Sequence, residues 1–138
     1  MKESDLWRYL REGMKGKHFQ ATRIESSAGN GVPDVAFAIP TKHGWIELKY
    51  IKEWPKRPTT LVKLPLRPEQ KQWIESRGKL ANNVWVICRI GDTFFLLDHK
   101  EAIMLCEGGT VDAWDALCTR SWYKRIDFDN LWEILRWE

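Results

Sequence analysis

Three ionisable residues that lie close together in the sequence could do chemistry: Asp34, Glu47 and Lys49. Each stands beside an apolar run, where a charged side chain costs free energy to dehydrate unless it is paired or holds a metal. Two carboxylates supply the oxygen ligands that Mg²⁺ or Mn²⁺ prefers. A cation held there would neutralise a phosphodiester and lower the pKa of a bound water, which a neighbouring lysine could orient or deprotonate. The triplet therefore favours metal-assisted hydrolysis.

Two strands of a predicted β-hairpin would have to position this triplet. Alternate residues of a strand share a side, so Glu47 and Lys49 point the same way, and Asp34 shares its side with two alanines. The larger apolar residues fall on the opposite side: Val35, Phe37, Ile39, Ile46 and Leu48. The three ionisable groups meet only if paired residue numbers have an odd sum, as with Asp34 opposite Glu47 or Lys49. An even sum would split them across the sheet.

Two predicted helices could add groups to the same place. An amphipathic helix over residues 3–15 carries Glu3 at its start, where an acid is also favoured simply by the helix N-terminus. Pro68 opens a second helix, which we expect to end at Gly78, with Gln70 on its inward face. A glutamine on a buried face needs hydrogen-bond partners, either in the backbone or in the site.

A basic, proline-rich insertion at about residues 52–67 separates the hairpin from the second helix. A loop of this length is uncommon in a compact domain unless it is functional or disordered. Basic groups around an aromatic side chain suit phosphate contacts and base stacking. The candidate nucleic-acid-binding residues are Lys52, Trp54, Lys56, Arg57, Lys63 and Arg67. The alternatives are a solvated insertion stiffened by its prolines and a tryptophan that packs it down.

The rest of the pattern predicts an α/β fold, with a central mixed β-sheet of about five strands flanked by helices. We expect further strands over 19–25, 84–90 and 93–97, and helices over about 100–106, 111–119 and 128–136. The last helix could seal the core or form a dimer contact. Residues 1–138 are expected to form a single domain, with a C-terminal helical extension at about 100–138.

Composition narrows the function classes. With 138 residues, 43% hydrophobic and 30% charged, the chain suits a soluble globular domain, and its net charge of +3 permits a nucleic-acid partner. No apolar run approaches the ~20 residues of a membrane span and no signal-peptide core is present, so we expect no membrane partner and a cytoplasmic location. The three cysteines lack a paired spacing, which argues against a disulfide framework or structural zinc. Phosphate-loop, dinucleotide and hydrolase-elbow motifs are absent from the sequence.

Pro33-Asp34 followed by Glu47-Leu48-Lys49 resembles the motif of the PD-(D/E)XK nuclease superfamily. With Glu3 on the first helix and Gln70 at the start of the next, the pattern is similar to the VRR-NUC-like and archaeal Holliday-junction-resolvase branches, and to small stand-alone phage nucleases. The resemblance covers roughly residues 3–90. It implies a restriction-endonuclease-like core in the order αβββαβ, and for a phage protein a location in the host cytoplasm.

The resemblance also implies roles for individual residues. Asp34 and Glu47 would bind Mg²⁺ or Mn²⁺ with the backbone carbonyl of Leu48, and Lys49 would be the catalytic lysine. Glu3 would support these ligands or bind a second metal, and Gln70 would position the lysine or a phosphate. The implied activity is a Mg-dependent endonuclease that cuts DNA by in-line attack of water and leaves 5′-phosphate ends. Junction or branched DNA is one candidate substrate, and flaps, duplex, single-stranded DNA and RNA stay open; a homodimer would suit a four-way junction.

Two other interpretations stay open. The chain could be a non-catalytic nucleic-acid-binding protein on a nuclease-like fold, although a pure binder has no use for a carboxylate pair that repels phosphate. The triplet could also be a purely structural ion-pair cluster, which predicts that Lys49→Met is tolerated.

Overall fold

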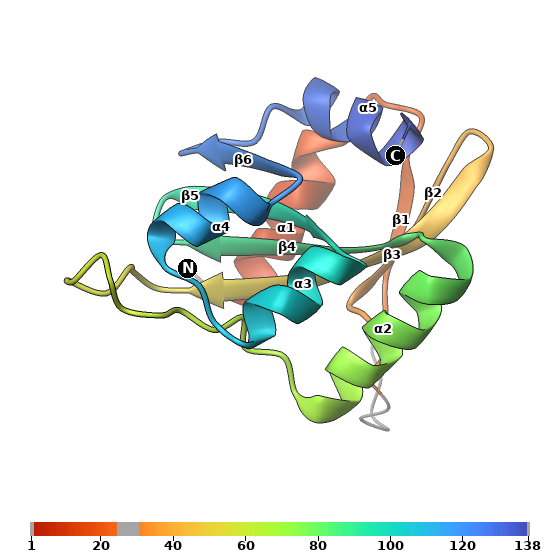
Figure 1. Cartoon of the computed structure of the whole chain (residues 1–138). Coiled ribbons are helices and arrows are strands. Elements are labelled where there is room, and N and C mark those ends of the chain that lie inside the picture. Colours follow the sequence, from red (N-terminus) through yellow and green to blue (C-terminus); the bar gives the residue numbers. More distant parts are fainter. Residues whose placement is uncertain (1, 25–30, 138) are drawn as a thin grey trace.

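The computed structural model describes residues 2–24 and 31–137 (Figure 1). The elements follow in this order: α1 (Glu3–Gly13), β1 (Gln20–Arg23), β2 (Val35–Ile39), β3 (Lys42–Ile51), α2 (Pro68–Ala81), β4 (Val84–Ile90), β5 (Thr93–Asp98), α3 (His99–Cys106), α4 (Val111–Leu117), β6 (Arg120–Tyr123) and α5 (Phe128–Trp137). The first six have the predicted order αβββαβ. The predicted end of the first strand, Glu25, lies outside the described residues.

The strands form one six-stranded sheet in the order β1-β2-β3-β4-β5-β6. Only β3 and β4 pair in parallel, because α2 makes the crossover between them, and the other neighbours are antiparallel. This mixed sheet flanked by helices is the predicted fold class. The sheet has one strand more than expected, since β6 was not among the predicted elements.

The hairpin register agrees with the prediction. Val35 pairs with Ile46, and Ile39 pairs with Lys42, so paired residue numbers have an odd sum. Continuing the register by one pair sets Asp34 opposite Glu47. Both acids therefore lie on the face of the sheet away from the large apolar residues of β2.

Two apolar clusters cover the two faces of the sheet. On one face, α1 and α5 pack against β2 and β3 through residues that include Leu6, Leu10, Leu131 and Leu135. On the other face, α2, α3 and α4 pack against β4 and β5, with Trp114 fully buried. Figure 1 shows α3 and α4 in front of the sheet and α1 behind it. Of the two predicted roles for the last helix, it has the first, sealing the core. Among the described residues, none of the helices has the length and apolarity to cross a membrane.

The prediction that Gly78 ends the second helix is wrong. Helix α2 continues to Ala81, and Asn82 ends it in the left-handed conformation with φ 50°. Gly78 is instead a packing position, because a Cβ there would lie 2.2 Å from Cγ of His99. The glycine lets α3 approach α2 closely.

The second half of the 52–67 insertion is attached to the domain. Val62 exchanges backbone hydrogen bonds with Gly109 at 2.8 and 3.0 Å, and the Leu64 N–H donates to the Leu105 carbonyl at 2.9 Å. Val62 and Leu64 are buried, and the indole N–H of Trp114 donates to the Val62 carbonyl at 3.0 Å. The first half, up to Leu61, stays mostly exposed.

Candidate active site

Asp34 is fixed by the backbone of the neighbouring strand. It stands immediately before β2, and its Oδ2 accepts a hydrogen bond at 2.9 Å from the backbone N–H of Leu48. The Leu48 side chain is buried in the core on the far face, so this donor cannot move independently of the sheet. The Asp34 carbonyl also accepts from the N–H of Ile24 at 2.6 Å. The carboxylate is therefore held over the middle of β3.

Glu47 is the most deeply buried acid of the site, with 1% of the residue exposed. Its Oε2 accepts a hydrogen bond from Nε2 of Gln70 at 3.0 Å and lies 3.4 Å from Nζ of Lys49. Its Oε1 is buried and makes no hydrogen bond within the described part of the chain. Burial raises the pKa of Glu47 to about 8, and the nearby charge of Asp34 acts in the same direction, whereas Lys49 opposes the shift.

Helix capping fixes the orientation of Gln70. Its Oε1 accepts from the backbone N–H of Arg67 at 2.9 Å, as the third helical residue does in a capping box. Only the oxygen of the amide can accept, so the NH₂ group must face Glu47. Helical spacing predicted that Gln70 faces inward but not that the Arg67 N–H orients its amide. Pro68 at the first helical position was the signal that Gln70 is the third helical residue, where a capping box forms.

Lys49 completes the network from the same face of β3. Its side chain is 11% exposed, and it is paired in register with Cys88 of β4. Cys88 is fully buried, and burial raises the pKa of its thiol far above the usual range. The cysteine is therefore a packing residue beneath the lysine and not a nucleophile.

Glu3 approaches the triplet from the N-terminus of α1. Partial burial raises the pKa of its carboxyl group, Lys49 opposes this shift, and the charge of Asp34 adds to it. Arg23 and Arg67 also lower the pKa of Glu3. The predicted site residues thus come together from α1, the start of β2, β3 and α2.

The chemistry of the donors fits a hard cation. Within residues 2–24 and 31–137, no group of three or more His, Cys, Asp or Glu side chains is placed to hold a metal. Mg²⁺, however, commonly uses one or two protein carboxylates and completes its shell with water and substrate phosphate. The unpaired Oε1 of Glu47 beside Asp34 is such a carboxylate donor, and a buried oxygen without a partner is otherwise unfavourable.

The candidate residues of the insertion divide into exposed cations without an ion pair and residues with a partner in the domain. Lys52, Lys56, Arg57 and Lys63 are exposed, and none forms an ion pair with another described residue. Arg67 lies 3.2 Å from Glu69. Trp54 is half-buried and packs edge-on against Phe95 and Trp114, with ring centroids 5.8 and 6.3 Å apart. These contacts correspond to the alternative in which Trp54 packs the insertion down.

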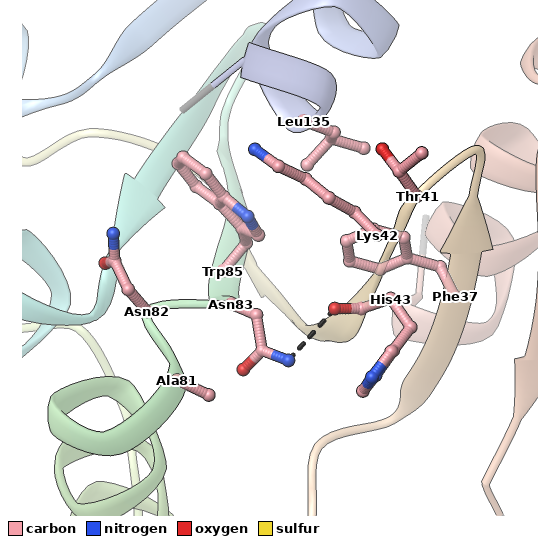
Figure 2. A pocket seen from close by; sticks show the side chains of 9 residues that line it. All are labelled: Phe37, Thr41, Lys42, His43, Ala81, Asn82, Asn83, Trp85 and Leu135. Carbon is pink, nitrogen blue, oxygen red and sulfur yellow. Dashed lines mark hydrogen bonds between the residues drawn. The ribbon is translucent and has the colours of Figure 1, made fainter.

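A separate hollow of about 350 Å³ lies at the opposite end of β3 from Lys49 (Figure 2). It forms where the β2–β3 turn meets the α2–β4 connection, and Nδ2 of Asn83 donates there to the His43 carbonyl at 2.9 Å. The lining residues are Phe37, Thr41, Lys42, His43, Ala81, Asn82, Asn83, Trp85 and Leu135. With no carboxylate in this lining, the hollow lacks the metal-binding character of the triplet.

Comparisons with known proteins give likenesses among solved structures. No protein-family model matches the chain, and no curated protein matches it. Among solved structures, it is similar to Hjc, a Holliday junction resolvase from Archaeoglobus fulgidus, with 16% sequence identity and a TM-score of 0.48. The similarity covers 72% of this chain and 75% of that chain. Function is therefore inferred from the residues of this chain.

Proposed function

We propose that the protein is a metal-dependent nuclease that hydrolyses phosphodiester bonds of DNA. The observation that carries the proposal is the Glu47 carboxylate, which is 1% exposed, lies beside Asp34 and has an unpaired Oε1. Lys49 is the one cation within ion-pair distance of Glu47 among the described residues. When both acids are ionised, two carboxylates and one ammonium leave the site short of positive charge, which a divalent cation would supply.

Asp34 and Glu47, with the backbone carbonyl of Leu48, would hold Mg²⁺ or Mn²⁺. When bound, the cation neutralises phosphate charge and lowers the pKa of a coordinated water. Because Asp34 is fixed by the Leu48 N–H and Glu47 by Gln70, both ligands are oriented before the metal arrives. Such preorganisation is what a catalytic metal site needs.

Lys49 is the residue best placed to act on the water or the phosphate. Its ammonium is held 3.4 Å from Glu47 and is largely shielded from solvent, so its charge is weakly screened. It would orient the attacking water, or offset the charge that develops on the phosphate oxygens in the transition state. Glu3 would support the same region from α1.

The exposed cations of the insertion would bind the DNA backbone. Lys52, Lys56, Arg57 and Lys63 follow β3 directly after the site and are not neutralised by a described acid. Phosphate contacts of this kind dominate affinity without selecting sequence. The resemblance to the VRR-NUC-like and resolvase branches of the PD-(D/E)XK superfamily adds junctions and branched DNA to the substrates to test, with a homodimer as the matching assembly.

The test is cleavage of labelled junction, flap, duplex and single-stranded DNA with Mg²⁺, Mn²⁺ or chelator. Wild type and the control Lys79→Ala, an exposed lysine on α2, should cut at least one substrate in a metal-dependent way. Asp34→Asn and Lys49→Ala should bind the same DNA without cutting it. A Lys49→Ala variant that cuts at the wild-type rate would overturn the proposal. Wild-type binding that is indifferent to chelator and yields no product would support the non-catalytic alternative.

A further inference from the structure

Arg77 of α2 contacts two indoles and, among the described residues, pairs with no acid. Its guanidinium carbon lies 4.6 Å from the ring centroid of Trp73 and 5.7 Å from that of Trp45. The two indoles meet edge-on, 5.2 Å apart. No described carboxylate lies within ion-pair distance of Arg77, whereas Arg67 pairs with Glu69. The hydrogen-bond donors of Arg77 are therefore available to bind an anionic ligand.

The cluster of Trp45, Trp73 and Arg77 begins directly beside the candidate active site. Trp45 precedes Glu47 by two residues, which places both side chains on one face of β3. Trp73 follows Gln70 by three residues on α2, and Arg77 lies one turn further. With a rise of 1.5 Å per residue, Arg77 stands about 10 Å along the helix from Gln70.

A shallow hollow of about 360 Å³ runs along one stripe of α2 and includes Trp73 and Arg77. Its lining residues recur at helical spacing: Glu69, Gln72, Trp73, Ser76, Arg77 and Leu80. The acid at its near end, Glu69, is offset by Arg67 at 3.2 Å. The far end presents the positive charge of Arg77.

Stacking prepares a guanidinium to bind an anion. A guanidinium that stacks on an indole keeps its in-plane N–H groups free, and these can bind a phosphate with two parallel hydrogen bonds. The order imposed by the rings also lowers the entropy lost when a ligand binds. Packing alone would not require a charge at this half-buried position, since an apolar side chain would cover the indoles without a charge to solvate.

We propose that Arg77 binds a backbone phosphate of the nucleic acid on one side of the cleavage site, with Trp73 and Trp45 as its support. The inference rests on the proposed function and deepens it by naming a second contact region. Along β3, Trp45 precedes the metal ligands and Lys52 follows them, so Arg77 and the insertion lie on opposite sides of the site.

The first test is binding of labelled DNA by fluorescence anisotropy in chelator, which prevents cleavage, over a series of salt concentrations. Arg77→Ala should weaken binding on the order of tenfold and reduce the slope of log affinity against log salt by about 0.9. Arg77→Lys should retain the slope, because it retains the charge. The matched control Lys79→Ala removes the same charge from α2 and should change neither quantity, since Lys79 lies outside the hollow.

The second test replaces single phosphates of the DNA with neutral methylphosphonates. In wild type, one neutral linkage to the side of the cleavage site should weaken binding as much as Arg77→Ala does, and in Arg77→Ala the same linkage should have no further effect. Thermal melting confirms that each variant is folded. The inference is overturned if a folded Arg77→Ala protein binds like Lys79→Ala, or if no linkage shows this non-additivity. In that case DNA cleavage and binding by wild type still stand, so the proposed function survives separately.

Discussion

The stability of the metal-free protein should fall as the pH rises from about 5 to 8, because of Glu47. Its pKa is raised from 4.5 to about 8 in the folded state. Below pH 4.5 the group is protonated in both folded and unfolded chains and contributes no pH dependence. Between the two values the unfolded chain has released the proton and the folded chain retains it, so each rise in pH favours unfolding.

The size of this effect follows from the pKa shift. Each pH unit in the window lowers the free energy of unfolding by about 1.4 kcal/mol at most. The total reaches several kcal/mol, which is a large share of the 5–15 kcal/mol that typical domains have. Because Glu47 is almost completely buried, solvent screens little of this energy. A cation that binds the ionised carboxylate removes the penalty, so Mg²⁺ should stabilise the protein most at pH 8.

Urea unfolding at pH 5, 6, 7 and 8, with chelator or saturating Mg²⁺, measures this effect. Glu47→Gln is the matched control, because it retains the shape and the contact with Gln70 but cannot ionise. In chelator the variant should lose less stability than wild type across the window and should be the more stable protein at pH 8. It should gain little from Mg²⁺. If the stabilities of the two proteins change in parallel from pH 5 to 8, the ionisation of Glu47 does not cause the pH dependence.

Three further changes have definite expected outcomes. Gln70→Leu removes both the helix cap and the hydrogen bond to Glu47, so chemical unfolding should show a free energy of unfolding lower by about 1–2 kcal/mol. Calorimetry should show weaker Mg²⁺ binding. An unchanged unfolding midpoint would contradict the role of Gln70 as both cap and hydrogen-bond donor. A Gly→Ala change normally stabilises a helix interior, but the Cβ of Gly78→Ala would lie 2.2 Å from His99. The free energy of unfolding, derived from thermal melting, should therefore fall by about 1–3 kcal/mol instead of rising. Lys49→Met should slow cleavage by at least about 10²-fold without lowering the melting temperature, and full activity would instead support a purely structural ion pair.

The hairpin and its site were predictable because two independent patterns agree. Apolar residues at alternating positions fixed which face of β2 and β3 is buried, and only an odd-sum register satisfies both strands. That same condition brings Asp34 to Glu47. Gln70 followed from helical spacing after Pro68, whose position at the start of α2 is a strong local signal.

The features that escaped prediction depend on neighbours distant in sequence. Glycine is typical of a helix end, which is why Gly78 was predicted to end α2. Only the close approach of His99 from α3 explains a glycine inside this helix. Strand β6 is four residues long and lies at the sheet edge with one buried residue, so it carries no alternating pattern. The contact of Arg77 with Trp45 crosses from α2 to β3, so the spacing of residues within the helix does not reveal it.

Ionisation of the buried Glu47 destabilises the fold, and the proposed cation would remove this penalty. Gln70 contacts the same carboxylate. A buried carboxylate pair is tolerated when a proton or a cation compensates its charge, so protons and the proposed Mg²⁺ would compete for Glu47. Gln70 can donate to Glu47 whether or not it is ionised, because its oxygen is already occupied by the Arg67 N–H. The ligand therefore keeps its orientation when the proton leaves, and the start of α2 retains its cap. In this arrangement the free energy spent on burying Glu47 is recovered when the cation binds, so metal affinity should rise with pH until the proton no longer competes.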